Sequence, residues 1–362
     1  MPTATLPHVD RVNRMMERRD HDRVPRFDAF WPETLDHWSK QGLTGGKLGA
    51  LDLLDADIEI IAGIEPCPFP GRREVISETE DTQLVKDGFG ASMRWWKGRF
   101  GTPEHTGFDC DTAEKWYNIY KPALLENAHQ IDLDRFRDGL AGARSRERWT
   151  MFQTIEAYEF MRRLMGDEIA LIAMITEPDW FADVSKTYTD VLLTNMQDLV
   201  DNDIVTDGVF LSADMGYNHG LMFSPASYRQ QLRPDQQHIV DFFHAHGIKV
   251  FLHTDGNVNE VVDQYIEMGF DSLHPLENAA HMDLAELVPT FGDQLSFWGN
   301  QDKRIWECGD RERIEAHVRD RLAHGMTKHG YGFHSDHSVQ PAVDLDTYRF
   351  IVDVVDRHGS YE

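Results

Sequence analysis

Five strand-helix units follow one another in the C-terminal half of the sequence. Each unit begins with a short apolar run that favours a β-strand and continues with a segment that favours a helix. The apolar runs are GVFLSAD (208–214), KVFLHTD (249–255), SLHPLE (272–277), LSFWGN (295–300) and YGFHSDHS (331–338). Strands that alternate with helices form a parallel sheet whose faces are covered by the helices. The repeat therefore predicts a protein of the α/β class.

The helical segments carry recognisable start and stop signals. Ser224 stands before Pro225 at the start of a helix predicted over 224–247, and Gly247 ends that helix. Gly269 ends the next predicted helix, over 257–269, in the same way.

Polar residues at the ends of the apolar runs distinguish between two kinds of parallel sheet. The runs end in Asp214, in His253 with Asp255, in His274 with Glu277, in Asn300, and in His334 with Asp336 and His337. An open sheet binds its ligand at one switch point, whereas a (β/α)8 barrel brings the carboxyl ends of all its strands to one mouth. No GxGxxG motif follows a predicted strand. The pattern therefore predicts a (β/α)8 TIM barrel with its site at the C-terminal mouth.

The N-terminal half is less regular. VPRFDAFW (24–31), DADIEIIAG (55–63) and WTMFQTI (149–155) favour strands. Residues 72–100 favour β-hairpins, so we expect a rim insertion at about 65–110. Because no low-complexity linker divides the chain, the sequence predicts one domain over residues 1–362.

Composition narrows the partners that we expect. The chain has 62 acidic and 36 basic residues and a net charge of −26, which disfavours nucleic acid, anionic membranes and polyanionic substrates. Its three cysteines, Cys67, Cys110 and Cys308, form no CxxC pair, which argues against a disulfide framework or a thiolate zinc site. No apolar run approaches the roughly 20 residues of a membrane span, and the N-terminus lacks the apolar region of a signal peptide. We therefore expect a cytoplasmic protein.

A series of short motifs occurs in a recognisable order along nearly the whole chain. The motifs are RVNRMMERRDHDRVPRFDAFW, EAYEFMRRLMG followed by EPDWFADV, LSADMGYNHGLMFSPASYRQQLRP, HTDG, GFDSLHPLE, LSFWGN and DHSVQP. In this order they resemble the uroporphyrinogen decarboxylase (URO-D) superfamily, which includes corrinoid- and thiol-dependent methyltransferases. The resemblance implies a (β/α)8 barrel that performs methyl transfer or decarboxylation at its mouth.

The resemblance also implies a metal site, with altered ligands. The methyltransferase branch has His-x-Cys where this chain has His253 and Asp255, and a zinc-binding cysteine near the position of His337. The decarboxylase branch has a histidine at the position of His337 and an arginine-rich N-terminal loop that this chain lacks. His253, Asp255 and His337 would thus form a site of two histidines and one carboxylate, a set that suits Zn²⁺ or Fe²⁺. The alternative is a hydrogen-bonded pair of His253 and Asp255 without metal.

Other polar residues at the strand ends are candidates for catalysis or substrate binding. The family position of Asp214 implies an active-site acid, and the alternative is a loop cap. Glu277 would be a fourth ligand, a general base or an acid at a helix N-terminus. His334 would be a ligand, an orienting residue or a substrate contact. The residues expected to bind substrate are His219, Trp31, His274 and Asn300.

These expectations lead to a metal-dependent methyl (one-carbon) transferase or demethylase that acts on a small organic substrate. The metal would be Zn²⁺, with Fe²⁺ as the alternative, and the methyl acceptor would be tetrahydrofolate, a thiol or a corrinoid. The resemblance leaves room for a corrinoid protein partner and for a homodimer. The alternative functions are a decarboxylase or related lyase for a small carboxylic acid and a non-catalytic barrel that binds a small molecule.

Overall fold

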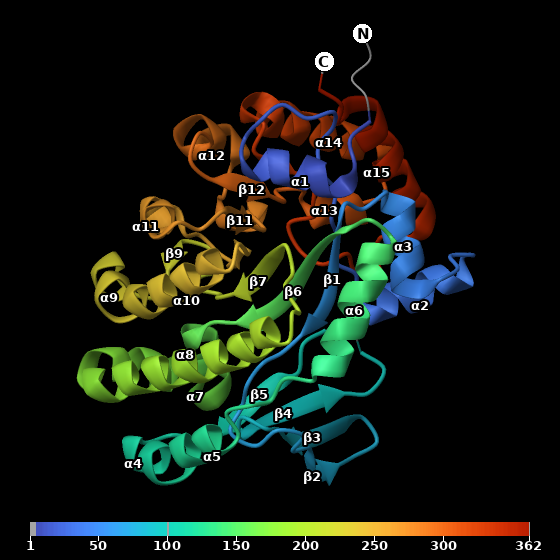
Figure 1. Cartoon of the computed structure of the whole chain (residues 1–362). Coiled ribbons are helices and arrows are strands. Elements are labelled where there is room, and N and C mark those ends of the chain that lie inside the picture. The colour runs from blue at the N-terminus through green and yellow to red at the C-terminus, as the bar shows by residue number, and fades with distance from the viewer. Residues whose placement is uncertain (1–4, 100, 362) are drawn as a thin grey trace.

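A parallel sheet of seven strands forms the centre of the protein (Figure 1). The computed structural model describes residues 5–99 and 101–361. The strands neighbour one another in the order β1, β6, β7, β10, β11, β12, β13, and the sheet curls into a half-barrel. They are β1 (Ile58–Gly63), β6 (Trp149–Ile155), β7 (Gly208–Ser212), β10 (Lys249–His253), β11 (Ser272–His274), β12 (Ser296–Trp298) and β13 (Tyr331–Gly332). The structure thus confirms the α/β class and the parallel sheet.

Helices pack around this sheet, most of them on its outer side (Figure 1). In the N-terminal half they are α1 (His8–Met16), α2 (Pro32–Lys40), α3 (Gly46–Leu54), α4 (Ala113–Lys115), a π-helix (Trp116–Tyr120), α5 (Lys121–Glu126), α6 (Leu133–Ser145), α7 (Ala157–Thr176) and α8 (Pro178–Asp201). In the C-terminal half they are α9 (Pro225–Gln231), α10 (Arg233–Ala245), α11 (Val262–Met268), α12 (Leu284–Phe291), α13 (Lys303–Glu307), α14 (Arg311–Gly325) and α15 (Leu345–His358), with 3₁₀ turns at Asn259–Val261, Asn278–Ala280 and Met326–Lys328. Among the described residues, no helix has both the length and the apolar character to cross a membrane.

The strands are buried on both faces, as their continuous apolar runs predict. The larger core lies between the sheet and the helices. A smaller apolar cluster lies on the inner face and includes Ile58, Trp149, Met151, Phe210, Phe251 and Trp298 from the strands and Val12, Met15 and Met16 from α1. Helix α1 therefore packs against the inside of the sheet, while the polar residues that follow the strands lie at the carboxyl ends.

The predicted helix signals are partly correct. Ser224 caps α9, because its hydroxyl accepts a hydrogen bond from the N–H of Ser227 at 3.0 Å. Gly247 and Gly269 have left-handed φ values of +73° and +88°, as the ends of helices require. The single helix predicted over 224–247 is wrong: the chain forms α9 and α10, which meet near Pro234, a residue that has no N–H to continue a helix.

The segment 24–31 does not form the strand that its sequence predicts. It is extended and makes isolated bridges, Arg26 with Phe333 and Phe30 with Val339. The N–H of Phe333 donates to the carbonyl of Pro25 at 2.8 Å, and the N–H of Asp57 donates to the carbonyl of Arg26 at 2.7 Å. The segment therefore bonds both to the chain after β13 and to the chain before β1. Pro25 interrupts the regular ladder because it cannot donate.

The region predicted to form hairpins contains a four-stranded antiparallel sheet. Its strands are β2 (Glu74–Glu78), β3 (Thr82–Lys86), β4 (Ala91–Trp96) and β5 (Glu104–Phe108), and a separate two-stranded hairpin comprises β8 (Gly216–Tyr217) and β9 (Gly220–Leu221). Gly166, with φ of +78°, interrupts the helical backbone of α7 where that helix meets β5. A Cβ atom at Gly166 would lie 2.4 Å from the ring of Phe108, so only glycine allows this close packing.

Candidate active site at the carboxyl ends of the strands

Three histidine rings form a hydrogen-bonded chain across neighbouring strands. His253 ends β10 and His274 ends β11, and the two residues are paired in register. The Nδ1 atoms of these rings are 2.9 Å apart, and Nε2 of His274 is 3.1 Å from Nδ1 of His334, which follows β13. The convergence of strand ends that the sequence predicts therefore brings His253, His274 and His334 into direct contact.

Burial keeps the inner part of this chain neutral. Desolvation lowers the pKa of His274 well below its usual value and lowers the pKa of His334 to about 3. Nδ1 of His334 also faces the carbonyl oxygen of Ser335, which can only accept a hydrogen bond. If His334 carries its proton on Nδ1, His274 accepts at Nε2 and donates from Nδ1 to His253. The remaining proton of a neutral His253 then lies on Nε2.

Two carboxylates face Nε2 of His253. Oδ1 of Asp214, which follows β7, is 3.6 Å from this nitrogen, and Oδ1 of Asp255 is 3.9 Å from it. Asp214, His253 and Asp255 can each offer one ligand atom such that all three atoms lie within 4.8 Å of one another. His337, the third ligand expected from the sequence, lies further out, with Nε2 4.0 Å from Oδ2 of Asp255. The tightest set of donors thus contains Asp214 in the place expected for His337.

The two carboxylates differ in their electrostatics. Burial raises the pKa of Asp255 above its usual value, although the charge of His253 opposes this effect. Burial would also raise the pKa of Asp214, but the charges of His253 and Arg162 outweigh it and leave that pKa below the usual range. Oδ1 of Asp255 is buried and has no hydrogen-bond donor among the described residues. A buried oxygen without a partner is costly, so this atom indicates a site for a cation or a proton.

A small cavity of about 180 Å³ lies beside the histidine chain. Its walls combine apolar residues with polar ones, namely Phe27, Ala29, Ile60, Phe210, Gln153, Ser212, Ser338, His253, His274, His334 and His337. The ring of Phe210 stacks on His253 with a centroid separation of 5.1 Å and meets His274 edge-on at 5.2 Å. The cavity can therefore hold a small molecule against the imidazole groups in a partly apolar setting.

A larger cavity of about 650 Å³ adjoins the same cluster at Asp214. It lies between α7 and the antiparallel sheet. Arg162 of α7 donates to Asp214 at 3.3 Å, and Arg162 also pairs with Glu159 at 2.7 Å and Asp167 at 2.8 Å. Asp214 lines this larger cavity, and its partner His253 lines the smaller one, so that contact connects the wall of one cavity to the wall of the other.

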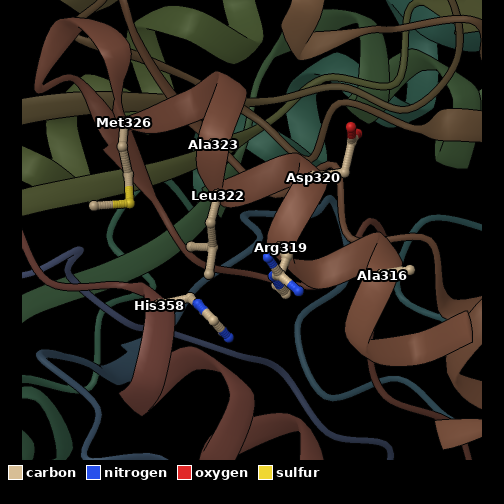
Figure 2. Close-up of a pocket in the computed structure, with 7 residues that line it drawn as sticks. All are labelled: Ala316, Arg319, Asp320, Leu322, Ala323, Met326 and His358. Atoms are coloured by element: carbon tan, nitrogen blue, oxygen red, sulfur yellow. The ribbon is translucent and has the colours of Figure 1, made fainter. Parts of the chain in front are cut away.

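Another hollow lies on the outer helical layer. It is formed by α14, the turn after it and the end of α15, with Leu322, Met326, Arg319 and His358 around it (Figure 2). Its residues come from helices rather than from the carboxyl ends of the strands. The ionisable residues at the strand ends line the two cavities beside the Asp214–His253 contact rather than this hollow.

Other residues expected from the sequence have supporting or peripheral positions. The carboxylate of Glu277 accepts a hydrogen bond from the N–H of Gly256 at 3.1 Å, which holds the turn after Asp255. Asn300 is fully buried, and its amide donates to the carbonyl of Leu276 at 2.7 Å. His219 is exposed on the β8–β9 hairpin, and Trp31 is half-buried before α2. The geometry thus gives Glu277 and Asn300 structural contacts in these loops.

Two residues next to the site were not among those expected from the sequence. Arg162 belongs to a helix, so no strand-end signal marks it. Asp28 is buried behind His334, with 3.8 Å between Oδ1 and Nε2. It accepts hydrogen bonds from Ser335 at 2.6 Å and Tyr348 at 3.0 Å, and burial raises its pKa to about 7. The acidic end of the 24–31 segment was the available signal for Asp28.

Comparison with known proteins identifies the family. A family model described as uroporphyrinogen decarboxylase (URO-D) matches residues 161–358, more than half of the chain and all strands from β7 to β13. Among solved structures, a methyltransferase from Methanosarcina mazei is similar over 97% of this chain and 99% of that one, with a TM-score of 0.69 and 15% identity.

Other solved structures match a smaller part of this chain, with lower TM-scores. ZgEngAGH5_4 in complex with a cellotriose covers 63% of this chain and 78% of its own, with a TM-score of 0.40 and 12% identity. A chitinase from Chromobacterium violaceum ATCC 12472 covers 63% and 85%, with a TM-score of 0.34 and 8% identity. No curated protein matches the sequence. The match over residues 161–358 shows that the chain belongs to the uroporphyrinogen decarboxylase (URO-D) family.

Proposed function

We propose that this protein is a metal-dependent methyltransferase that moves a one-carbon group of a small organic substrate. The observation that carries the proposal is the set of donor atoms from Asp214, His253 and Asp255, which lie within 4.8 Å of one another between two cavities. The unpartnered, buried Oδ1 of Asp255 belongs to this set. The family and the methyltransferase of the same fold are consistent with this class of reaction.

The donor set suits a divalent metal. His253 and Asp255 would hold it, with Asp214 or His337 as the third ligand; nitrogen and oxygen donors suit Zn²⁺ and Fe²⁺. A metal bound here would supply Lewis acidity toward a heteroatom of the substrate or acceptor. His253 must offer the lone pair of Nε2 and carry its proton on Nδ1. This reverses the proton positions of the metal-free chain: Nδ1 of His274, 2.9 Å away, then accepts the hydrogen bond of His253, and His274 carries its own proton on Nε2.

The residues around the donor set have separate tasks. Asp214 has a lowered pKa, and where His337 is the third ligand its free carboxylate can take up a proton released by the methyl acceptor. Arg162 holds that carboxylate from the side of the larger cavity. Phe210 and Phe27 line the smaller cavity and exclude water from the histidines.

The proposal includes a closed (β/α)8 barrel that forms one domain. The hydrogen bonds of Pro25 with Phe333 and of Arg26 with Asp57 support closure, because they connect the chain after β13 to the chain before β1 through the segment 24–30. The acceptor would be a thiol, tetrahydrofolate or a corrinoid.

Decarboxylation of a small carboxylic acid is the second candidate function. The family description favours it, and so does the small cavity, where the histidines could hold a carboxylate group. Methyl transfer requires an acceptor and leaves a methylated product. Decarboxylation requires no acceptor and releases CO₂.

The direct test is to load the purified protein with Zn²⁺ or Fe²⁺ and supply methylated donors with a thiol or tetrahydrofolate. We expect a methylated acceptor by mass spectrometry, and loss of the product in His253→Ala. His324→Ala, on α14 where the side chain is 41% exposed, is the matched control and should retain the product. Release of CO₂ from a carboxylic acid without an acceptor, and no methylated product, would instead favour the decarboxylase.

A further inference from the structure

The larger cavity has walls of two different chemical kinds. The α7 wall is charged and includes Glu159, Arg162 and Asp167. The wall from the antiparallel sheet is aromatic and includes Trp95 of β4 and Phe108 of β5. The Gly166 contact holds the two walls together, since α7 approaches the ring of Phe108 at that point.

The lining of the cavity as a whole has an excess of acidic residues. Four carboxylates, from Asp87, Glu159, Asp167 and Asp214, line the cavity with the two guanidinium groups of Arg162 and Arg163. Burial lowers the pKa of His105, so that ring adds no positive charge at neutral pH. With all four carboxyls ionised, the formal charge of the lining is two minus four, or −2; burial raises the pKa of Asp87 and of Glu159, so −2 is the most negative value that the lining reaches. Such a lining attracts cations and repels anions.

Both arginines are already engaged by carboxylates. Arg162 pairs with Glu159, Asp167 and Asp214. Arg163 pairs with Glu65 at 2.6 Å and with Glu159 at 3.2 Å. An anionic ligand would have to displace these partners to bind a guanidinium group. A cationic ligand would be attracted by the surplus of carboxylates, and no existing ion pair would have to break.

The aromatic wall also favours a positively charged ligand. The side chain of Trp95 is large and apolar, and the residue remains 43% exposed where it lines the cavity. The rings of His105 and Phe108 stack next to it, with centroids 5.5 Å apart. The face of an aromatic ring attracts a cation, and indole does so most strongly. Trp95 therefore offers an apolar contact that favours a positive charge over a negative one.

We infer that this cavity binds a methylated onium group, a quaternary ammonium or a sulfonium, as the charged head of the substrate. The inference rests on the proposed methyl transfer, because an onium group carries a methyl group that can be transferred. When a thiol accepts the methyl group, the bond from carbon to nitrogen or sulfur breaks and its electron pair stays on the departing heteroatom. A new sulfur–carbon bond forms, the onium becomes neutral, and the proton of the thiol passes to a carboxylate and then to water.

The test uses three probes of nearly the same shape and different charge. They are choline, its neutral isostere 3,3-dimethylbutan-1-ol and the anion 3,3-dimethylbutanoate. Binding to the full-length protein is measured by calorimetry and by tryptophan fluorescence, without metal or acceptor. We expect choline to bind about tenfold more tightly than the neutral isostere, as a cation–π contact of roughly 1–2 kcal/mol implies, and the anion to bind most weakly.

Variants of neighbouring tryptophans locate the binding site. Trp95→Ala should weaken choline binding about tenfold, and Trp95→Phe should restore part of it. Trp96→Ala is the matched control, because Trp96 is the next residue of β4 and its ring holds Arg99 at 4.7 Å. It should leave choline binding unchanged. Circular dichroism of each variant checks that the fold is retained.

The outcomes separate this inference from the proposed function. The onium site would be overturned by equal binding of the three probes, by preference for the anion, or by choline binding that Trp95→Ala leaves unchanged. The methyltransferase proposal would survive that result if a neutral methyl ether proved to be a methyl donor. Trp95-dependent choline binding without methylated thiol from any donor would support the onium site and contradict the methyltransferase.

Discussion

Oδ1 of Asp214 lies 3.6 Å from Nε2 of His253, and this contact connects the wall of the larger cavity to the wall of the smaller one. Asp214 follows β7 and His253 ends β10, so two adjacent parallel strands bring the residues together. The same carboxylate is held by Arg162 from α7. The site therefore depends on a residue that connects the sheet, the helix and both cavities.

Variants of the four donor residues should reveal the metal ligands. We expect His253→Ala and Asp255→Asn to remove bound Zn²⁺ or Fe²⁺, measured as metal per chain by mass spectrometry after dialysis. Asp214→Asn should do the same, whereas His337→Ala should retain most of the metal, because Asp214 belongs to the tighter set. If Asp214→Asn kept the metal and His337→Ala lost it, His337 would be the third ligand.

His274 should position His253 for metal binding. His274→Ala removes the ring that contacts Nδ1 of His253 at 2.9 Å, so His253 loses its orienting partner. Loss of such a partner typically lowers metal affinity by about 10–100-fold. Competition with a chelating dye measures this affinity, and His324→Ala on α14 serves as the control. An unchanged affinity in His274→Ala would show that His253 is oriented by other contacts.

Gly166→Ala should destabilise the protein. The added Cβ would lie 2.4 Å from the ring of Phe108, and alanine would have to adopt φ of +78°. We expect a loss of about 1–3 kcal/mol in the free energy of unfolding by urea. Gly107→Ala is the matched control in β5, because a Cβ there has no neighbour within 4 Å among the described residues. Equal stability of the two variants would contradict the close packing at Gly166.

Glu156 should make stability depend on pH. Its carboxyl is fully buried before α7, and burial raises its pKa from 4.5 to about 7. Between these values the native state keeps a proton that the unfolded state has lost. The stabilising effect is therefore complete below pH 4.5 and falls as the pH rises toward 7.

Glu156→Gln provides the comparison, because its amide does not titrate. From pH 4.5 to 7.5, wild type should lose on the order of 2–3 kcal/mol relative to the variant. Urea unfolding at several pH values measures the difference. Parallel curves for the two proteins would show that Glu156 does not hold its proton in the native state.

Asp57 should be important for folding at the end of the sheet opposite the site. Its buried carboxylate pairs with Arg11 at 2.5 Å, with Arg23 at 2.8 Å and with His8 at 2.8 Å. Asp57→Asn would take one carboxylate from Arg11 and from Arg23 and leave them with Asp22 and Asp55, so the loss should not exceed the roughly 3–5 kcal/mol of a fully unpaired buried charge. Urea unfolding measures the loss. Asp36→Asn removes an exposed partner of Lys40 and should change stability by less than about 1 kcal/mol.

Patterns along single strands predicted part of the side-chain arrangement at the strand ends. Residues two apart in a strand point to the same side. β10 ends at His253, yet Asp255 just beyond it still faces the same way, with Nε2 and Oδ1 3.9 Å apart. Parallel strands also end at a common edge, which is why His274 and His334 were expected near them. These relationships follow from local backbone geometry, so they can be derived from spacing alone.

Contacts between distant segments could not be derived in this way. The preference for Asp214 over His337 depends on how the loops after β7 and β13 pack, and neither loop has a regular repeat. Arg162 reaches the site from a helix, whose position relative to the sheet is set by the Gly166 contact with Phe108.

The sequence by itself determined the α/β class, the parallel sheet and the gathering of histidines and carboxylates at its carboxyl ends. These features depend on short-range periodicity and on the common direction of parallel strands. Only the tertiary structure decided which donor atoms lie together, how the rings of His253, His274 and His334 connect, and that a second cavity opens beside Asp214. Those distances join residues far apart in the chain, and they are set by the curvature of the sheet and the packing of α7 against β5.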